Sequence, residues 1–180
     1  GVETEEDIRE FLAADLSKVS DGSELTDMEK GVSIIQDAIA AGKHIRIIGD
    51  YDVDGVTSTY ILYKGLIGLH AKCDKFIPHR IKDGYGLHEN AIRRAREDGV
   101  EVILTCDNGI AATDAVSLAK EFGMTVVVTD HHEVPFVQEP DGRRYILPAA
   151  DAVIDPKRPE DHVFKEICGA VVAWKFMGRL

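Results

Sequence analysis

Short apolar runs alternate with stretches of helical periodicity from residue 44 to the end of the chain. Buried strands are predicted at Ile45–Ile48, Val102–Leu104, Val126–Val128 and Ala152–Ile154, with a weaker candidate around Phe76 and Ile77. Helices are predicted near residues 57–69, 89–98, 112–122 and 167–180. This alternation predicts an α/β fold: a doubly wound, mainly parallel sheet with flanking helices.

The first 43 residues follow a different pattern and predict an N-terminal helical segment. One apolar helix face is formed by Met28, Val32, Ile35 and Ile39. Before it, Thr26 and Glu29 have the spacing of a capping box. Glycines that end helices are expected at positions 42, 99 and 123. The chain is therefore predicted to consist of a helical segment, 1–43, and a larger domain, 44–180.

Residues 133–150 have neither kind of periodicity. They hold three prolines and the pair Asp141-Gly142, both typical of turns. We therefore expect a loop or an irregular insertion there.

Composition narrows the class of protein. No apolar run approaches 18 residues, so no membrane span is expected. The cysteines Cys73, Cys106 and Cys168 are odd in number and form no CxxC, which favours the free thiols of a cytoplasmic protein. The chain begins at Gly1 with no signal peptide, and we expect it to be a fragment of a longer protein.

The net charge of −11 argues at first against a nucleic-acid partner. Its distribution changes this interpretation, because residues 1–37 contribute −8 and residues 38–180 only −3. Two bound divalent cations would make the larger part slightly positive. A substrate that carries phosphate is therefore not excluded.

Acidic and imidazole side chains follow four of the predicted strands. They are Asp50, Asp52 and Asp54 after the first strand, then Asp107, then Asp130 with His131 and His132, and finally Asp155. The carboxyl ends of parallel strands share one edge, where ligands bind. Clustered carboxylates repel one another unless a cation neutralises them. Asp and His donors suit several divalent metals, and an oxygen-rich set favours Mn²⁺ or Mg²⁺.

Two simpler interpretations fit less well. Asp50, Asp52, Asp54 and Gly55 match the start of an EF-hand loop, but Ile61 stands where its last ligand should be, and a strand precedes the loop. A single Asp after a strand usually caps a helix, whereas capping does not require three within five residues. Cys106 is more typical of a strand core than of a nucleophile.

The order of these motifs resembles the DHH phosphoesterase superfamily, and within it the RecJ-type single-strand-specific DNA exonucleases. The motifs are GDYDVDG at 49–55, DNG at 107–109 and TDHH at 129–132, with supporting pieces at 78–80, 83–87 and Gly169-Ala170. Other branches of the superfamily carry a histidine where this chain has Ile48, which favours the RecJ type. The likeness extends from about residue 5 to the end.

The resemblance implies a phosphodiesterase that uses two ions of Mn²⁺ or Mg²⁺. It implies that Asp52 and Asp54 bind different metals, that Asp107 bridges them, and that His131 binds one. Asp50 is a further ligand or supports one. The remaining implied roles are contact with the scissile phosphate for His132, orientation of a neighbouring group for Asp130, and phosphate binding for Arg80 and Asn108.

The resemblance also implies the biological setting. We expect hydrolysis of single-stranded DNA from its 5′ end in DNA repair and recombination, with other repair proteins as further candidate partners. A later metal-binding Asp of the family falls beyond residue 180, so we expect a C-terminally truncated DHH domain that binds metal weakly or binds only one ion, and that is inactive alone. The alternatives are a relative that hydrolyses short oligonucleotides, cyclic dinucleotides or pyrophosphate, and a non-catalytic module of a replication complex.

Overall fold

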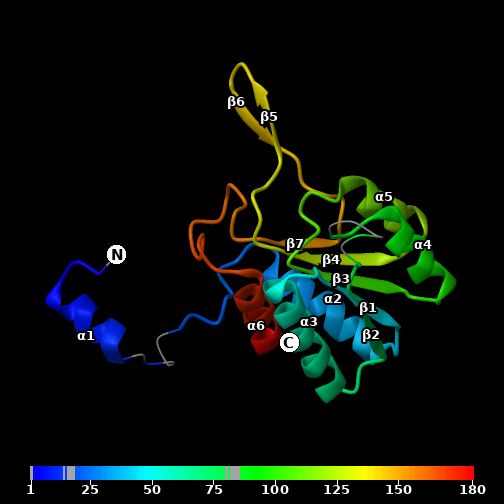
Figure 1. The fold of residues 1–180 in the computed structure, drawn as a ribbon, viewed down its shortest axis with the longest axis horizontal. Coiled ribbons are helices and arrows are strands. Elements are labelled where there is room, and N and C mark those ends of the chain that lie inside the picture. The colour runs from blue at the N-terminus through cyan, green and yellow to red at the C-terminus, as the bar shows by residue number, and fades with distance from the viewer. Residues whose placement is uncertain (1, 14, 16–18, 80, 82–85) are drawn as a thin grey trace.

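The computed structural model has a parallel sheet with helices on both faces (Figure 1). It describes residues 2–13, 15, 19–79, 81 and 86–180. The helices are α1 (Glu5–Ala13), α2 (Met28–Ala40), α3 (Val53–Gly68), α4 (Glu89–Glu97), α5 (Thr113–Glu121) and α6 (Gly169–Arg179). The strands are β1 (Ile45–Ile48), β2 (Cys73–Phe76), β3 (Val102–Cys106), β4 (Thr125–Thr129), β5 (Phe136–Glu139), β6 (Gly142–Tyr145) and β7 (Ala152–Ile154).

Five strands form the main sheet in the order β2-β1-β3-β4-β7, and every neighbouring pair is parallel. One buried cluster joins the sheet to α2, α3 and α6, and a second joins its other face to α4 and α5. Strands β3 and β7 are buried throughout, and β4 nearly so, which is why they appear in the sequence as unbroken apolar runs. The predicted α/β fold is confirmed.

The predicted helices are present with small shifts at their ends. The largest shift is in α3, which begins at Val53 and therefore contains Asp54, while Asp52 caps its first turn. Gly42, Gly99 and Gly123 have φ values of 67°, 71° and 75° just beyond helix ends, as expected for C-terminal caps.

The capping box predicted at Thr26 and Glu29 is wrong. Asp27 precedes α2 in a left-handed conformation and makes no side-chain cap. Thr26 instead donates from its backbone N and from Oγ1 to Oδ1 of Asp161, 2.9 and 2.8 Å away. A contact across 135 residues thus replaces the local one, and it ties the start of α2 to the segment before α6.

Helix α2 is part of the core, whereas α1 is exposed. Met28 and Ile35 of α2 are fully buried, and a Cβ on Gly31 would lie 2.7 Å from Ile154 of β7. Phe11 and Leu12 of α1 are 72% and 74% exposed, and Figure 1 shows α1 apart from the sheet. Among the described helices, none combines the length and the apolar character that crossing a bilayer requires.

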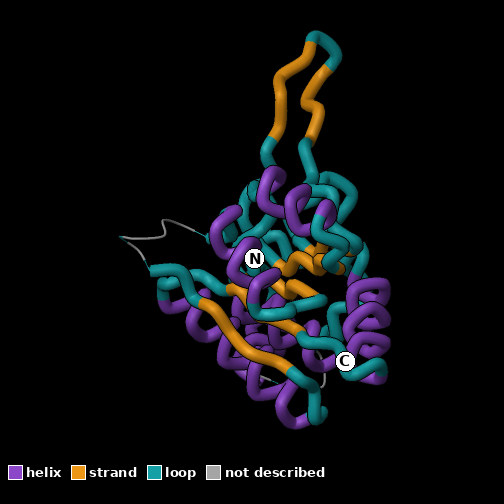
Figure 2. Tube along the Cα trace, turned by 90° about the vertical axis from the view of Figure 1, so that its right-hand side faces the viewer, coloured by secondary structure: helices purple, strands orange, loops and turns teal. Residues whose placement is uncertain are grey.

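The prediction of a loop or irregular insertion over 133–150 is wrong for residues 136–145. Strands β5 and β6 form an antiparallel hairpin there, joined at Pro140-Asp141. Figure 2 shows this hairpin projecting far from the rest of the molecule. All eight of its strand residues are exposed, so neither burial nor apolar alternation marked them in the sequence.

Candidate metal centre and active site

The candidate site lies at the carboxyl edge of the main sheet. Strand β1 sits between β2 and β3, so the chain leaves β1 toward one side of the sheet and continues from β3 toward the other. Ligands of doubly wound sheets bind at this switch point. The acidic loop after β1 and Asp107 after β3 flank it directly.

Two glycines shape the loop after β1. A Cβ on Gly49 would lie 1.9 Å from Thr59 Oγ1, and one on Gly55 would lie 2.5 Å from the carbonyl oxygen of Asp50. Only glycine permits the loop to turn this tightly against α3. The turn buries Asp50, which is 1% exposed, while Asp52 accepts a hydrogen bond from Gly55 N at 2.9 Å.

The loop after β3 turns at Asp107, whose φ is 59°. This left-handed conformation is tolerated best by Gly, Asn and Asp. Asp107 is 2% exposed. Next to it, Asn108 donates from Nδ2 to the carbonyl oxygens of Ile48 and Cys106, at 3.0 and 2.9 Å. Because both amide protons are used, donation from this amide to a phosphate would require one of these bonds to break.

Strand β4 ends in Asp130, His131 and His132. The Asp130 carboxylate is buried and accepts from Ile110 N and His131 N, at 2.9 and 2.8 Å, and lies 2.7 Å from His132 Nδ1. Asp130 therefore holds the loop and the second imidazole in place. His131 points the other way, with Nε2 2.9 Å from Asp107 Oδ1.

Asp54 is held from the far end of the chain. Its carboxylate accepts hydrogen bonds from the backbone N–H groups of Gly169 and Ala170, both 2.7 Å long, and lies 3.4 Å from His131 Nε2. These N–H groups begin α6, where a helix favours negative charge. A Cβ on Gly169 would lie 2.8 Å from Asp107 Oδ1. The sequence motif included Gly169 but did not reveal this contact.

The donor set fits a divalent cation. Two groups of candidate ligands each have their donor atoms within 4.8 Å of one another: Asp50, Asp52 and Asp107, and Asp107, His131 and His132. Asp50 Oδ1 is buried with no hydrogen-bond partner in the described part of the chain. A buried carboxylate oxygen without a partner is costly unless a cation satisfies it. Asp107 belongs to both groups, as a bridging ligand would.

Burial governs the acidity of the site. It raises the pKa of Asp107 and of Asp50, although a hydrogen bond with His131 opposes the effect at Asp107. Burial also raises the pKa of Asp155 to about 7, and the neighbouring Asp130 carboxylate adds to the shift. The hydrogen bond to Asp130 raises the pKa of His132 to about 9.

Cys106 has the environment of a core residue. It is fully buried at the end of β3, and burial raises the pKa of its thiol to about 12. A thiol in this state is a poor nucleophile. None of the three cysteines forms a disulfide, as the sequence predicts.

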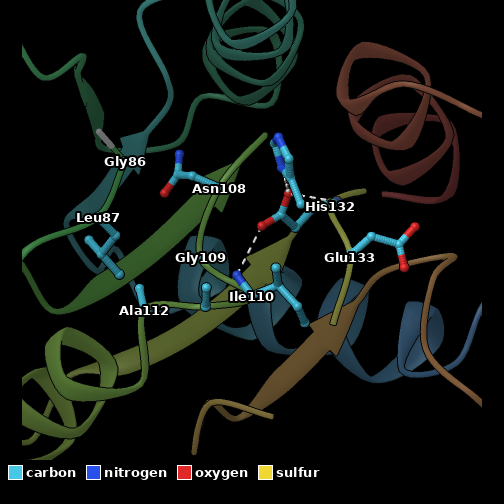
Figure 3. A pocket seen from close by; sticks show the side chains of 10 residues that line it. Gly86, Leu87, Asn108, Gly109, Ile110, Ala112, His132 and Glu133 are labelled. Atoms are coloured by element: carbon cyan, nitrogen blue, oxygen red, sulfur yellow. Dashed lines mark hydrogen bonds and ion pairs between the residues drawn. The ribbon is translucent and has the colours of Figure 1, made fainter. Parts of the chain in front are cut away.

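Two cavities meet at His132. One, of about 330 Å³, is lined by Leu87, Asn108 and Ile110 among others (Figure 3). The other, of about 360 Å³, is lined by His131, Lys157 and Lys165 as well as His132. His132, a member of one candidate ligand group, thus borders open space on both sides, where a substrate can approach. Sequence reasoning did not single out the two lysines, which stand in a segment without regular structure.

The structure brings most of the predicted site residues to one place. They are Asp50, Asp52, Asp54, Asp107, Asn108, Asp130, His131 and His132. Arg80, predicted to bind phosphate, lies outside the described residues.

The fold and the site define an α/β protein with a carboxylate- and histidine-lined centre at the switch point of its sheet. The chain belongs to the DHH family: residues 44–179 match its N-terminal domain.

Curated relatives agree with this assignment. The chain is 41% identical over 176 residues to the single-stranded-DNA-specific exonuclease RecJ of Bacillus subtilis (strain 168), covering 97% of this chain and 21% of the relative. It is 36% identical over 156 residues to RecJ of Escherichia coli (strain K12), covering 86% and 26%. The chain therefore spans about a fifth to a quarter of the length of these relatives. The resemblance predicted from the motifs is confirmed.

Solved structures show the same fold. A crystal structure of exonuclease RecJ bound to manganese has a TM-score of 0.72 and 32% identity, covering 85% of this chain and 37% of that one. RecJ from Thermus thermophilus in complex with Mn²⁺ has a TM-score of 0.65 and 30% identity, covering 85% and 20%. These relatives hold the metal that the donor set here favours.

Proposed function

We propose that the protein is a metal-dependent phosphodiesterase that hydrolyses single-stranded DNA from its 5′ end. The observation that carries this proposal is the cluster of Asp50, Asp52, Asp107 and His131 at the switch point. In this cluster the buried Asp50 Oδ1 has no hydrogen-bond partner in the described part of the chain. The similarity to RecJ exonucleases supports the choice of substrate. The 5′ polarity follows the resemblance alone.

In this proposal five side chains hold two ions of Mn²⁺ or Mg²⁺. They are Asp50, Asp52, Asp54, Asp107 and His131. Bound ions of this kind polarise a phosphate and activate water as the nucleophile. Asp107 joins the two halves of the ligand set, and the first turn of α6 fixes Asp54.

His132 and Asp130 act on the substrate side. Asp130 fixes the ring of His132 through Nδ1 and so directs its second nitrogen away from the core. There the imidazole borders both cavities, in position to hydrogen-bond a phosphate oxygen. Asp130 thus serves as a positioning residue, because its own carboxylate is occupied by Ile110, His131 and His132.

We place this reaction in DNA repair and recombination in the cytoplasm. The substrate chemistry and the three free thiols are consistent with that compartment.

The decisive test replaces Asp107 by Asn, which tolerates the left-handed backbone and keeps the size of the side chain. With Mn²⁺ present, we expect Asp107→Asn to lower hydrolysis of single-stranded DNA more than about 100-fold, since even supporting residues of metal sites cost about 10–100-fold. Asp114→Asn, an exposed acid on α5, is the matched control. Circular dichroism checks that both variants fold.

The substrate panel separates the alternatives. The natural full-length protein is given 5′-phosphorylated single-stranded DNA, duplex DNA, a cyclic dinucleotide and pyrophosphate. Mononucleotides released from the single strand alone support the proposal. Hydrolysis of only a small substrate would assign the protein to another branch of the family, and wild-type activity of Asp107→Asn would overturn the metal assignment.

A further inference from the structure

The β5–β6 hairpin has two chemically different faces. Phe136 pairs with Tyr145 and Gln138 with Arg143 across the strands, so these four side chains share one face, which we call the aromatic face. Val137, Glu139 and Arg144 lie on the opposite face. Phe136 and Tyr145 remain 44% and 37% exposed. Their rings therefore face solvent instead of a core.

The aromatic face combines two rings with a cation. The ring centroids of Phe136 and Tyr145 are 6.0 Å apart, and the Arg143 guanidinium lies 4.2 Å from the Phe136 centroid. This packing orders the three side chains while leaving one side of each open.

Charge distinguishes the two faces further. On the opposite face, Arg144 donates to Glu139 at 2.6 Å and is neutralised. The aromatic face carries no acid, and Arg143 pairs with no carboxylate in the described chain. Aromatic rings beside an unneutralised arginine suit single-stranded nucleic acid, because bases stack on rings and guanidinium binds phosphate. An apolar protein partner would instead bury that arginine without a counter-charge.

The hairpin is continuous with the candidate active site. Strand β5 begins four residues after His132, and the chain then returns to β7, the neighbour of β4 in the main sheet. The β5 end of the hairpin is thus connected to the edge that carries the metal ligands, whereas the chain after β6 runs to the start of β7 at the opposite edge of the sheet (Figures 1 and 2). Each of its strands is about 13 Å long, enough for a short stack of bases.

We infer that the aromatic face binds single-stranded DNA outside the metal centre and so strengthens the binding of strands long enough to reach it. This inference rests on the proposed function for the identity of the substrate. It assigns Phe136, Arg143 and Tyr145 to binding and not to the chemical step. Short oligonucleotides that occupy only the metal centre do not engage the hairpin.

The test compares neighbouring positions on opposite faces. Arg143→Gln and Arg144→Gln remove the same charge from adjacent exposed residues, and Tyr145→Ala has Val137→Ala as its counterpart. Fluorescence anisotropy measures the binding of long and short oligothymidylates to the natural full-length protein with Ca²⁺ replacing the catalytic metal. We expect Tyr145→Ala to weaken binding of the long strand at least about fivefold, at the lower end for lost base stacking. Arg143→Gln should reduce the salt slope by about 0.7.

Binding and hydrolysis together separate this inference from the proposed function. The opposite-face variants should bind the long strand as the wild type does, and hydrolysis of the short oligonucleotide should be unchanged in all four. If the aromatic-face variants bind the long strand as tightly as the wild type, the inference is overturned, even if the wild type hydrolyses single-stranded DNA. If only the aromatic-face variants lose long-strand binding, and the wild type hydrolyses no DNA, the binding surface is supported and the proposed exonuclease activity is overturned.

Two further outcomes overturn the inference. Equal loss on both faces would show a general effect of charge or folding. An acidic peptide serves as a second probe. If the wild type binds this peptide and the aromatic-face variants do not, while their DNA binding is intact, the surface is assigned to protein recognition.

Discussion

Gly169 shows how one residue without a side chain shapes the site. It begins α6, donates its N–H to Asp54, and lies so close to Asp107 that a Cβ would fall 2.8 Å from Oδ1. Because glycine has no side chain, α6 can begin in direct contact with the candidate metal ligands. A second glycine in the same helix, Gly178, has nothing within 4 Å of its Cβ position. Alanine substitutions at the two glycines therefore separate the effect of steric crowding from that of helix propensity.

We predict that Gly169→Ala lowers hydrolysis at least about 10-fold by displacing Asp107, a loss typical of disturbed metal ligation. Gly178→Ala should leave activity unchanged and stabilise the fold by up to about 1 kcal/mol, because alanine favours a helix. Steady-state rates and urea unfolding of both variants test this. Full activity of Gly169→Ala would mean that the close approach is not needed.

The residues of the site differed in how far the sequence revealed them. Asp52, Asp107 and His131 follow strands of one parallel sheet, so their shared edge follows from chain order. The bonds from α6 to Asp54 join residues 115 and 116 positions apart, and no local pattern encodes them. The same holds for Thr26, whose long-range partner Asp161 displaced the predicted cap.

Among the elements, α5, β4 and the start of β7 are connected by a single carboxylate. Lys120 Nζ donates to both oxygens of Asp151, at 2.8 and 2.6 Å, and Val126 N donates to Oδ2 at 2.8 Å. Burial alone would raise the pKa of Asp151, but these hydrogen bonds outweigh it and lower the pKa. The folded state therefore favours the ionised form.

The pH dependence follows from that lowered pKa. The contribution of Asp151 is fully present above its unfolded pKa of about 3.9 and is lost as pH falls through the lower folded value. We predict that Asp151→Asn costs about 1 kcal/mol at pH 7, after allowance for solvent screening, and that this cost shrinks below about pH 4. Urea unfolding of both proteins across pH 3–7 measures it. A cost that stays constant with pH would contradict the ion pair.

Strands with a buried face were predictable, and exposed strands were not. Strand β3 is buried throughout because both of its faces are covered, so its apolar run Val102–Leu104 differs from the surrounding sequence. The β5–β6 hairpin buries neither face, and its only local signal, the Asp141-Gly142 turn, is equally typical of a loop.

For the molecule as a whole, a bound metal should act on stability as well as activity. The net charge is −11, and buried carboxylates at one edge of the sheet repel one another. An ion that binds only the folded state stabilises it by about 2.7 kcal/mol at about 100 times its Kd. The gain arises even where no substrate is hydrolysed.

We predict that Mn²⁺ at that excess raises the Tm by roughly 5–10 °C. Removal of the ion with EDTA should reverse the shift, and Asp107→Asn should show almost none of it. Differential scanning calorimetry with and without the ion makes the comparison. An equal shift in Asp107→Asn would place the ion elsewhere on the protein.

The hydrogen bonds from Gly169 and Ala170 to Asp54 also affect when the site can form during protein synthesis. On a ribosome that adds about 5–20 residues per second, Gly169 is made roughly 6–23 s after Asp54, because 115 positions separate them. A nascent chain that ends before residue 169 lacks both N–H groups that hold this carboxylate. The position of Asp54 described here is therefore fixed only after Ala170 has been added to the chain.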